Sequence, residues 1–430
     1  MGKRNRKSGK GGAKPGAGRR MRYGQHLLGL PKSALPDTPQ ACWQLARQLN
    51  ARQQPFRALS AVRHGLALAP GSPDLALEYA VSLGYTEQID AARIEFPKAL
   101  GSCDGTPDAE ADMLTRFAEM LVNCGFASEA ETHLRKALAL KPKHAAAHTQ
   151  MCWAMRRAGN RAAAIEHGEQ AFALSPDEDA GAYLTYAYLG ADRFADAVAV
   201  TDQMLSRNPL SVRALALRVS ALEGAGRRDE GVSLAHFESL VWSAGINPPA
   251  GYASVAKLNR DLAELVTNYP MRPYDTTQTL NLFDQPEPPA AALAGVLQMA
   301  ASHYLQNLPA DPQHPYLGQR PDSFKAESWG TLLYTYGDAE HHFHQNAWVS
   351  GVYYVDMPDF VQRAPPDNLD GCLEFSRFLN YSGSARVADN MVIRPEPGLI
   401  VMFPAYAYHR VLPFKRRGRR ISIAFNLLPE

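Results

Sequence analysis

A proline-terminated motif recurs through the first half of this 430-residue chain and limits the folds open to it. Four segments end alike, as LALAP, LALKP, FALSP and LSRNP, at Pro70, Pro142, Pro176 and Pro209. An alanine stands twelve residues before each proline, at Ala58, Ala130, Ala164 and Ala197. The last three prolines are 34 and 33 residues apart. A fixed period of this length indicates stacked repeats, in which each unit buries its apolar face against the next.

Each unit shows the pattern of two helices joined by a turn. Apolar residues recur at steps of three and four, as in an amphipathic helix, and Gly125 and Gly159 stand five residues before their alanines, where a turn is expected. This pattern resembles the tetratricopeptide repeat, a helix–turn–helix unit of about 34 residues. The resemblance implies a helical solenoid over residues 38–243. One degenerate unit would lie between Pro70 and Pro142, and a last unit that matches the motif poorly would lie near 210–243.

Solenoids of this type present a concave groove to partner segments. We therefore expect the repeats to bind a protein or peptide partner. The alternative is that the helices only support the second half of the chain or mediate self-association.

The N-terminal segment 1–25 has a different composition. Its first 23 residues carry nine Lys or Arg and no acid, and no large apolar side chain stands between Met1 and Met21. Such a segment cannot bury enough apolar surface to offset the entropy of ordering, so we predict a disordered tail. It would act as a solubilising tail or contact nucleic acid nonspecifically through its charge.

Composition also bears on the compartment. No apolar run approaches the ~20 residues needed to cross a bilayer, and the N-terminus lacks the apolar stretch of a secretory signal. The five cysteines are widely spaced and odd in number, which favours reduced thiols. These features predict a cytoplasmic protein with no membrane association.

The sequence pattern changes near residue 250. The segment NPPAGY (247–252) interrupts the helical periodicity, and helical character then continues through a lead-in, residues 244–327. From about residue 328 short alternating or β-branched runs such as WVSGVYYVDM, GLIVMFP and RRISIAFNLL are separated by Gly, Pro and Asp. Residues 328–430 are therefore predicted to form a β-sandwich or barrel flanked by helices.

Histidines are most concentrated in this β region. His342 and His344 would project to one face of a strand, while His341 points away, and His409 follows in a distant strand. Three imidazoles so placed can hold one metal ion and leave other positions open for substrate and oxygen. The alternative is a pair of surface or packed histidines without a metal.

A strand after His409 carries polar residues on one face. Alternation places Arg420, Ser422, Ala424 and Asn426 together, with Ile421, Ile423 and Phe425 opposite. An arginine beside a serine suits a carboxylate, because the guanidinium forms a charged bidentate pair and the hydroxyl adds a donor. The alternative is that Arg420 belongs to the solvated run of basic residues that precedes it. We interpret Asp356 and Glu374 as solvated surface acids.

The strings HFHQNAWVSGVYYV, GCLEF, IRPEPGLIVMFPAYAYHRVLP and RRISIAFN, in this order, resemble the 2-oxoglutarate–iron(II) oxygenases related to prolyl hydroxylases. The resemblance implies a double-stranded β-helix, or jelly roll, and hence an α+β multidomain chain. It implies that His342, His344 and His409 bind Fe(II). It also implies that Arg420 and Ser422 hold the distal carboxylate of 2-oxoglutarate, assisted by Tyr354.

One residue departs from the commonest pattern in that family, which has a carboxylate where this chain has His344. Three neutral imidazoles leave the metal its full charge, which dianionic 2-oxoglutarate would offset. The resemblance thus implies a dioxygenase, in particular a hydroxylase, that uses Fe(II), 2-oxoglutarate and molecular oxygen. Two alternatives stay open: a three-histidine metal enzyme that does not use 2-oxoglutarate, and a noncatalytic interaction protein with a degenerate β scaffold.

Overall fold

The computed structural model describes residues 29–52, 54–272, 275–284, 286–334, 339–377, 390–414 and 416–430. The predicted disordered tail, residues 1–25, lies outside the described residues. The chain divides into two compact units, Met1–Ser102 and Cys103–Glu430, which are described separately.

The first unit contains two helical hairpins. Its helices are α1 (Pro39–Ala51), α2 (Pro55–Leu68), α3 (Pro73–Tyr85) and α4 (Ile89–Gly101), and a short 3-10 helix η2 (Lys32–Ala34) precedes them. Both α1 and α3 begin with a proline that follows the N-cap residue. The hydroxyls of these N-cap residues, Thr38 and Ser72, each accept a backbone N–H of the first turn. The pairs α1–α2 and α3–α4 pack side by side, so α3 and α4 form the degenerate unit expected between Pro70 and Pro142.

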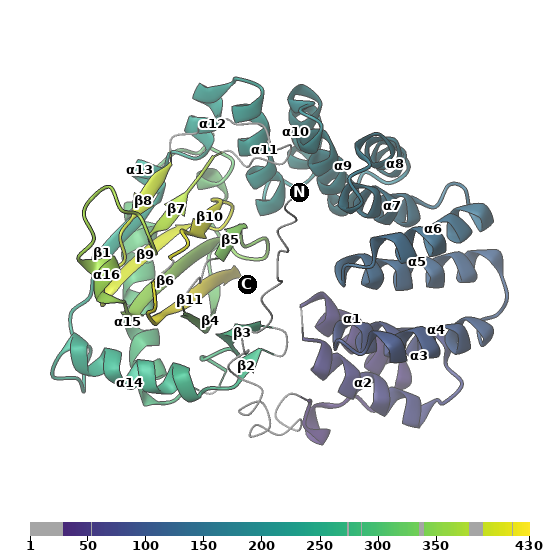
Figure 1. Cartoon of the computed structure of the whole chain (residues 1–430), viewed down its shortest axis with the longest axis horizontal. Helices are drawn as coiled ribbons and strands as arrows, with labels where there is room; N and C mark the ends of the chain where they lie inside the picture. The colour runs from purple at the N-terminus through teal and green to yellow at the C-terminus, as the bar shows by residue number, and fades with distance from the viewer. Residues whose placement is uncertain are drawn as a thin grey trace, which may run out of the picture. The chain divides into compact units, whose positions relative to one another are not determined.

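The second unit continues the repeats with eight helices. They are α5 (Pro107–Asn123), α6 (Ala127–Leu140), α7 (Ala145–Arg157), α8 (Arg161–Leu174), α9 (Glu178–Gly190), α10 (Phe194–Arg207), α11 (Val212–Gly224) and α12 (Arg228–Leu234). Each odd-numbered helix packs on the even-numbered helix that follows it, and α5, α7, α9 and α11 also contact one another in succession (Figure 1). This is the stacking of a helix–turn–helix solenoid, so the predicted repeat architecture is confirmed.

The repeat residues of the sequence motif explain the close packing. Ala130, Ala164 and Ala197 are fully buried, so a larger side chain there would separate the paired helices. The turns before them need a left-handed backbone, and Gly125 and Gly159 supply it with φ values of 91° and 78°. The equivalent turn before α10 uses Asp192 instead, with φ 57°.

Two antiparallel sheets follow the solenoid. The larger has the strand order β1-β9-β6-β11-β4-β3-β2, and the smaller has the order β5-β10-β7-β8. The strands of the larger sheet are β1 (Trp242–Gly245), β2 (Met271–Arg272), β3 (Asp275–Thr279), β4 (Phe324–Leu333), β6 (Val349–Asp356), β9 (Leu399–Pro404) and β11 (Arg420–Pro429). Those of the smaller sheet are β5 (Ala339–His342), β7 (Leu373–Phe375), β8 (Met391–Ile393) and β10 (His409–Val411). These antiparallel strands agree with the predicted jelly-roll fold.

Helices α14 (Val255–Asn268) and α15 (Pro288–Asn307) flank the larger sheet, and α14 contacts β4 and β6. Gly330 in β4 permits this contact, since a Cβ there would lie 2.5 Å from Val266 of α14. The segment 244–327, expected to be a helical lead-in, also contributes β2 and β3 to the sheet, and β1 pairs with β9 far along the chain. Short segments, α13 (Phe237–Leu240), α16 (Asp359–Gln362) and η3 (Leu317–Gln319), complete the second unit.

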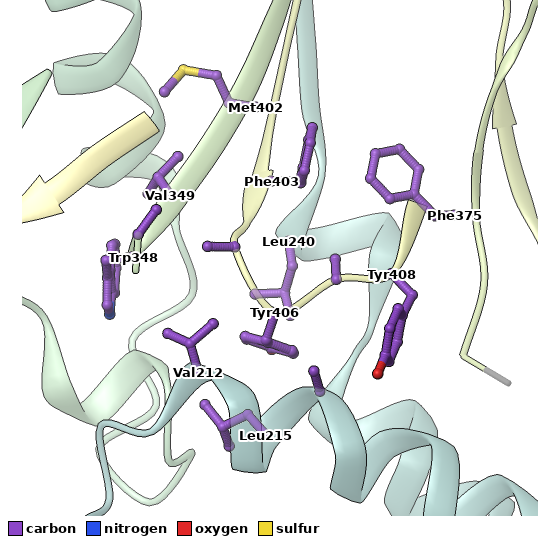
Figure 2. Close-up of a cluster of buried hydrophobic side chains, with 14 of the residues drawn as sticks. Val212, Leu215, Leu240, Trp348, Val349, Phe375, Met402, Phe403, Tyr406 and Tyr408 are labelled. Atoms are coloured by element: carbon purple, nitrogen blue, oxygen red, sulfur yellow. The ribbon is translucent and has the colours of Figure 1, made fainter. Parts of the chain in front are cut away.

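One hydrophobic core joins the last repeats to the sheets within the second unit. Figure 2 shows Tyr406, from the turn after β9, beside Val212 and Leu215 of α11. The Tyr406 hydroxyl donates to the carbonyl of Leu234 at 2.6 Å, and the Arg377 Nε donates to the carbonyl of Ala235 at 2.8 Å. These donors satisfy carbonyls at the end of α12, which have no N–H partner within the helix because the helix stops there. None of the described helices has the length and apolarity to cross a membrane.

Candidate metal centre and carboxylate site

The structure brings the three predicted metal-binding histidines together. His342 ends β5 and lies directly opposite His409 of β10, and His344 follows two residues after the end of β5. The strand therefore stops before His344, contrary to the extended segment expected through it. Its backbone is held instead by the His344 N–H, which donates to the carbonyl of Ala405 at 2.9 Å.

The geometry of this triad fits a metal ion. One ligand nitrogen from each of His342, His344 and His409 lies within 4.8 Å of the other two. Nitrogens bonded to one metal at about 2.1 Å are at most about 4.2 Å apart, so small ring rotations convert this arrangement into coordination. His342 is exposed, His344 partly buried and His409 buried, so the cluster is open to solvent on the His342 side.

Burial keeps the imidazoles of His344 and His409 neutral, and a local hydrogen bond orients that of His409. Burial lowers the pKa of His344 to about 3, and it holds the pKa of His409 well below its ordinary value. His409 Nδ1 lies 2.9 Å from the carbonyl of Ala407. Since that carbonyl can only accept, Nδ1 carries the proton and Nε2 keeps its lone pair for a metal. Neutral imidazole is the form that binds metal ions.

Aromatic rings surround the triad. Trp329 of β4 stacks on His344 with ring centroids 5.8 Å apart, and the Arg272 guanidinium lies over Trp329 at 4.8 Å from the ring centroid. On the other side Phe403 contacts His409 at 4.6 Å between centroids. No local sequence pattern predicts the role of Trp329, because its place beside His344 depends on how the two sheets that carry β4 and β5 pack together.

The opposite face of the smaller sheet carries a separate polar cluster. Glu374 of β7 is only 6% exposed and accepts hydrogen bonds from Arg410 of β10 and Asn390, and His341 Nε2 lies 3.5 Å from its carboxylate. Glu374 is thus a buried acid, and its interpretation as a solvated surface acid was wrong. Asp356 does lie at the surface, where it pairs with Arg419.

The second predicted group, Arg420, Ser422 and Tyr354, also lies together. Arg420 begins β11 and is 2% exposed, and its Nη1 donates to the Ser422 hydroxyl at 3.0 Å. Ser422 lies directly opposite Tyr354 of β6. No acidic side chain within the described residues pairs with Arg420, and its Nε has no hydrogen-bond partner there. Burial lowers the pKa of Arg420, because the cation has lost water without gaining an anion.

Tyr354 completes this carboxylate site. It is fully buried, the Arg420 guanidinium lies over its ring at 5.2 Å from the centroid, and its hydroxyl has no partner among the described residues. Burial raises the pKa of Tyr354 to about 12, so the hydroxyl is a neutral donor. A buried cation and a buried donor, both unsatisfied, together fit an anionic ligand with oxygen acceptors.

Comparison with known proteins agrees with this arrangement. Residues 327–426 match the model of a family described as "Putative 2OG-Fe(II) oxygenase", a family that implies Fe(II) and 2-oxoglutarate. A search of curated proteins found no match. The predicted nucleic-acid contact has no support among these comparisons and stays a prediction.

Solved structures resemble parts of the chain at low sequence identity. A tetratricopeptide-repeat protein from Thermus thermophilus is 21% identical, with a TM-score of 0.36, over 44% of this chain and 98% of its own. A prolyl-4-hydroxylase from Pseudomonas putida is 14% identical, with a TM-score of 0.30, over 46% of this chain and 93% of its own. Residues 327–426 therefore match the model of the 2OG-Fe(II) oxygenase family, and tetratricopeptide-type repeats precede them.

Proposed function

We propose that the C-terminal domain is an Fe(II)- and 2-oxoglutarate-dependent dioxygenase. His342, His344 and His409 would hold the metal, and Arg420, Ser422 and Tyr354 would bind the distal carboxylate of 2-oxoglutarate. When bound, the metal and co-substrate supply the oxidising chemistry that activates molecular oxygen. Hydroxylation of a substrate C–H bond is the reaction type that this pair of sites serves best.

The observation that carries this proposal is the unsatisfied pair formed by Arg420 and Tyr354. A buried guanidinium without an anion is costly, and a carboxylate ligand with two oxygens would satisfy Arg420 and the Tyr354 hydroxyl together. Both groups lie on the larger sheet, and Trp329 of β4, the strand that pairs with β11, stacks on His344 of the triad. The larger sheet therefore carries the carboxylate site and one side chain that contacts the candidate metal centre.

The chain's own residues would perform three tasks. The Arg420 guanidinium and the Ser422 and Tyr354 hydroxyls would orient the co-substrate along β11. Trp329 and Phe403 would exclude water from two sides of the triad. The exposed side, at His342, would admit the primary substrate.

A protein substrate or partner fits the repeats. Helices α7 and α9 carry Trp153 and Tyr183, which are half-buried and stack with ring centroids 5.0 Å apart, and Arg213 of α11 lies over Tyr183. Amphipathic rings on contacting helices suit the binding of an extended segment. We propose that the repeats bind such a segment and that the oxidised group is a protein side chain.

The test mixes anaerobic Fe(II)-loaded protein with 2-oxoglutarate and records visible absorption. A bidentate keto acid on Fe(II) should give a weak charge-transfer band. His409→Ala should lose the metal and the band, whereas Arg420→Ala should keep the metal and lose the band at moderate 2-oxoglutarate. The exposed Arg416→Ala, from the basic run before β11, is the matched control and should behave as wild type.

The outcomes separate the three functions. Metal binding without a band or succinate release at millimolar 2-oxoglutarate would favour a three-histidine enzyme that does not use this co-substrate. Absence of both metal and 2-oxoglutarate binding would favour a repeat-based interaction protein with a β scaffold.

A further inference from the structure

A row of polar side chains crosses one face of the larger sheet. Asn426 of β11 lies directly opposite Glu327 of β4 on one side and Ser350 of β6 on the other. Its carboxamide nitrogen donates to Glu327 Oε1 at 3.0 Å, and the Ser350 hydroxyl donates to its Oδ1 at 2.8 Å. Because a carboxylate can only accept, these two hydrogen bonds fix the orientation of the carboxamide. Asn426 and Ser350 are buried, whereas Glu327 is partly exposed.

The register between β4 and β11 places this row on the same face as both proposed sites. Side chains on one face of a strand are two residues apart, so Ser422, Ala424 and Asn426 follow one another along β11. Ser422 belongs to the carboxylate site, and Ala424 lies directly opposite Trp329, whose ring stacks on His344. The candidate metal centre therefore lies next to the middle of this face, with the carboxylate site toward one end and the polar row toward the other.

A second contact places the row beside the triad. Phe403 of β9 continues the row, because it lies directly opposite Ser350 on the same face. Its ring contacts that of His409, with centroids 4.6 Å apart. A substrate bound next to the metal, on the side away from the carboxylate site, would therefore lie over this row and close to the Glu327 carboxylate.

Glu327 is the charged member of the row, and it lacks a counter-ion. Its Oε1 accepts the carboxamide N–H of Asn426, and no Lys, Arg or His within the described residues forms an ion pair with it. Lys325, two residues away on β4, is exposed, and Arg272 places its guanidinium over the ring of Trp329. A carboxylate that a buried amide holds in place, without a cation, is suited to bind an ammonium or guanidinium group.

We infer that Glu327 is a specificity-determining residue for the primary substrate, and that this substrate presents a basic side chain, lysine or arginine, close to the atom that is oxidised. The inference rests on the proposed metal centre and names the substrate class of that centre. Asn426 and Ser350 are positioning residues, since they hold the carboxylate in one orientation. A charge-assisted hydrogen bond to Glu327 is stronger than a neutral one, and the same carboxylate repels an acidic side chain.

The test measures the binding of short peptides to the full chain loaded with Co(II), without turnover. The probes are four acetylated, amidated tripeptides with glycine at both ends and lysine, arginine, leucine or glutamate in the middle. The proton signals of a peptide broaden when it binds near the paramagnetic ion, and protein loaded with diamagnetic Zn(II) is the reference. We expect the lysine and arginine peptides to broaden, and the leucine and glutamate peptides to stay sharp at the same concentration.

Two variants separate the charge of Glu327 from its place in the fold. Glu327→Gln keeps an acceptor for Asn426 and loses the charge, so the Kd of the basic peptides should rise about tenfold while the affinity for Co(II) stays unchanged. Glu327→Asp keeps the charge and should retain the preference for basic over acidic peptides. The control, Glu396→Gln, neutralises an exposed acid before β9 and should bind the peptides as wild type does.

Two results would overturn the inference while the metal centre stands. One is equal broadening of basic and acidic peptides, or of none of the four at the highest concentrations they reach in solution. The other is an unchanged Kd of the basic peptides in Glu327→Gln. No Co(II) binding by the wild type would overturn both the inference and the metal centre. If Glu327→Gln does not fold, the four peptides on wild type and Glu327→Asp decide the question.

Discussion

His342 and His409 lie directly opposite each other on the antiparallel strands β5 and β10, with ring centroids 4.3 Å apart. Opposed residues of an antiparallel pair project to the same face of the sheet, so the register alone brings the two imidazoles together. His344 reaches the same point from the chain beyond β5, at 5.2 Å from both rings. The triad thus depends on one strand pairing and on the turn that follows it.

Replacement of Tyr354 by Phe separates ligand binding from folding. The Tyr354 hydroxyl is buried without a partner, so its removal should leave the free energy of unfolding unchanged or raise it by about 1 kcal/mol. The same change removes one hydrogen bond to a bound carboxylate, which should raise the Kd of 2-oxoglutarate about tenfold. Urea denaturation without ligand and a 2-oxoglutarate titration of the Fe(II) protein measure the two effects.

Tyr353→Phe is the control for that experiment. Its hydroxyl donates to Asn259 of α14, outside the carboxylate site, so this variant should lose stability and keep the affinity for 2-oxoglutarate. Equal affinities in wild type and Tyr354→Phe would remove Tyr354 from the proposed co-substrate site.

Glu374 should stabilise the strands that carry the histidines. Glu374→Ala leaves Arg410 and Asn390 without their acceptor and should lower the free energy of unfolding by about 1–3 kcal/mol, toward the lower value because Arg410 is partly solvated. Glu374→Gln keeps an acceptor oxygen and should lose less. Chemical denaturation of the metal-free protein compares the two. An alanine variant as stable as wild type would show that the cluster contributes nothing to holding β7 against β10.

The sequence predicted what depends on spacing within one segment. The alanine and proline registers predicted the helical pairs, and alternation in RRISIAFN predicted that Arg420 and Ser422 share a face, as their hydrogen bond shows. The two-residue step between His342 and His344 suggested a common metal ion. The first two relations follow from helix or strand periodicity over a few residues, whereas His344 reaches the cluster from the chain beyond the end of β5.

Relations between distant segments were not predictable in this way. β1 at residues 242–245 pairs with β9, and nothing in its four residues indicates that partner. The burial of Glu374 and the contact of Trp329 with His344 follow from strand order and register, which the local pattern does not specify. The continuous core from α8 to β11 likewise forms because Tyr406 and Arg377 meet the end of α12.

The turn between α3 and α4 contains a residue in an unfavourable backbone conformation. Glu87 has φ 58°, its side chain is exposed, and a β-carbon in this region costs about 1–2 kcal/mol. Glu87→Gly should therefore raise the free energy of unfolding of its repeat by about 1 kcal/mol, after the greater chain entropy of glycine is subtracted. The reciprocal change is Gly159→Ala. Gly159 has φ 78° and an added Cβ would meet open space, so the variant should lower the free energy of unfolding through backbone strain alone. Thermal unfolding of both variants tests the sign, and a lower Tm for Glu87→Gly would contradict it.

His314 makes stability depend on pH at the contact between the repeats and the sheets. It is buried, its Nε2 lies 3.2 Å from the Leu234 carbonyl, and its Nδ1 accepts the backbone N–H groups of Tyr316 and Leu317. Burial lowers the pKa of His314 below 6.5 in the folded protein, so the unfolded chain binds this proton more readily. Stability is then fully present above the unfolded pKa of about 6.5 and falls as the pH drops from there toward the folded pKa. His314→Gln cannot gain that proton, so the loss in urea midpoint between pH 7 and pH 5 should be smaller in the variant than in wild type. Other buried histidines are common to both proteins and cancel in this difference. Parallel midpoint curves for the two proteins would show that His314 takes up its proton without cost to the fold.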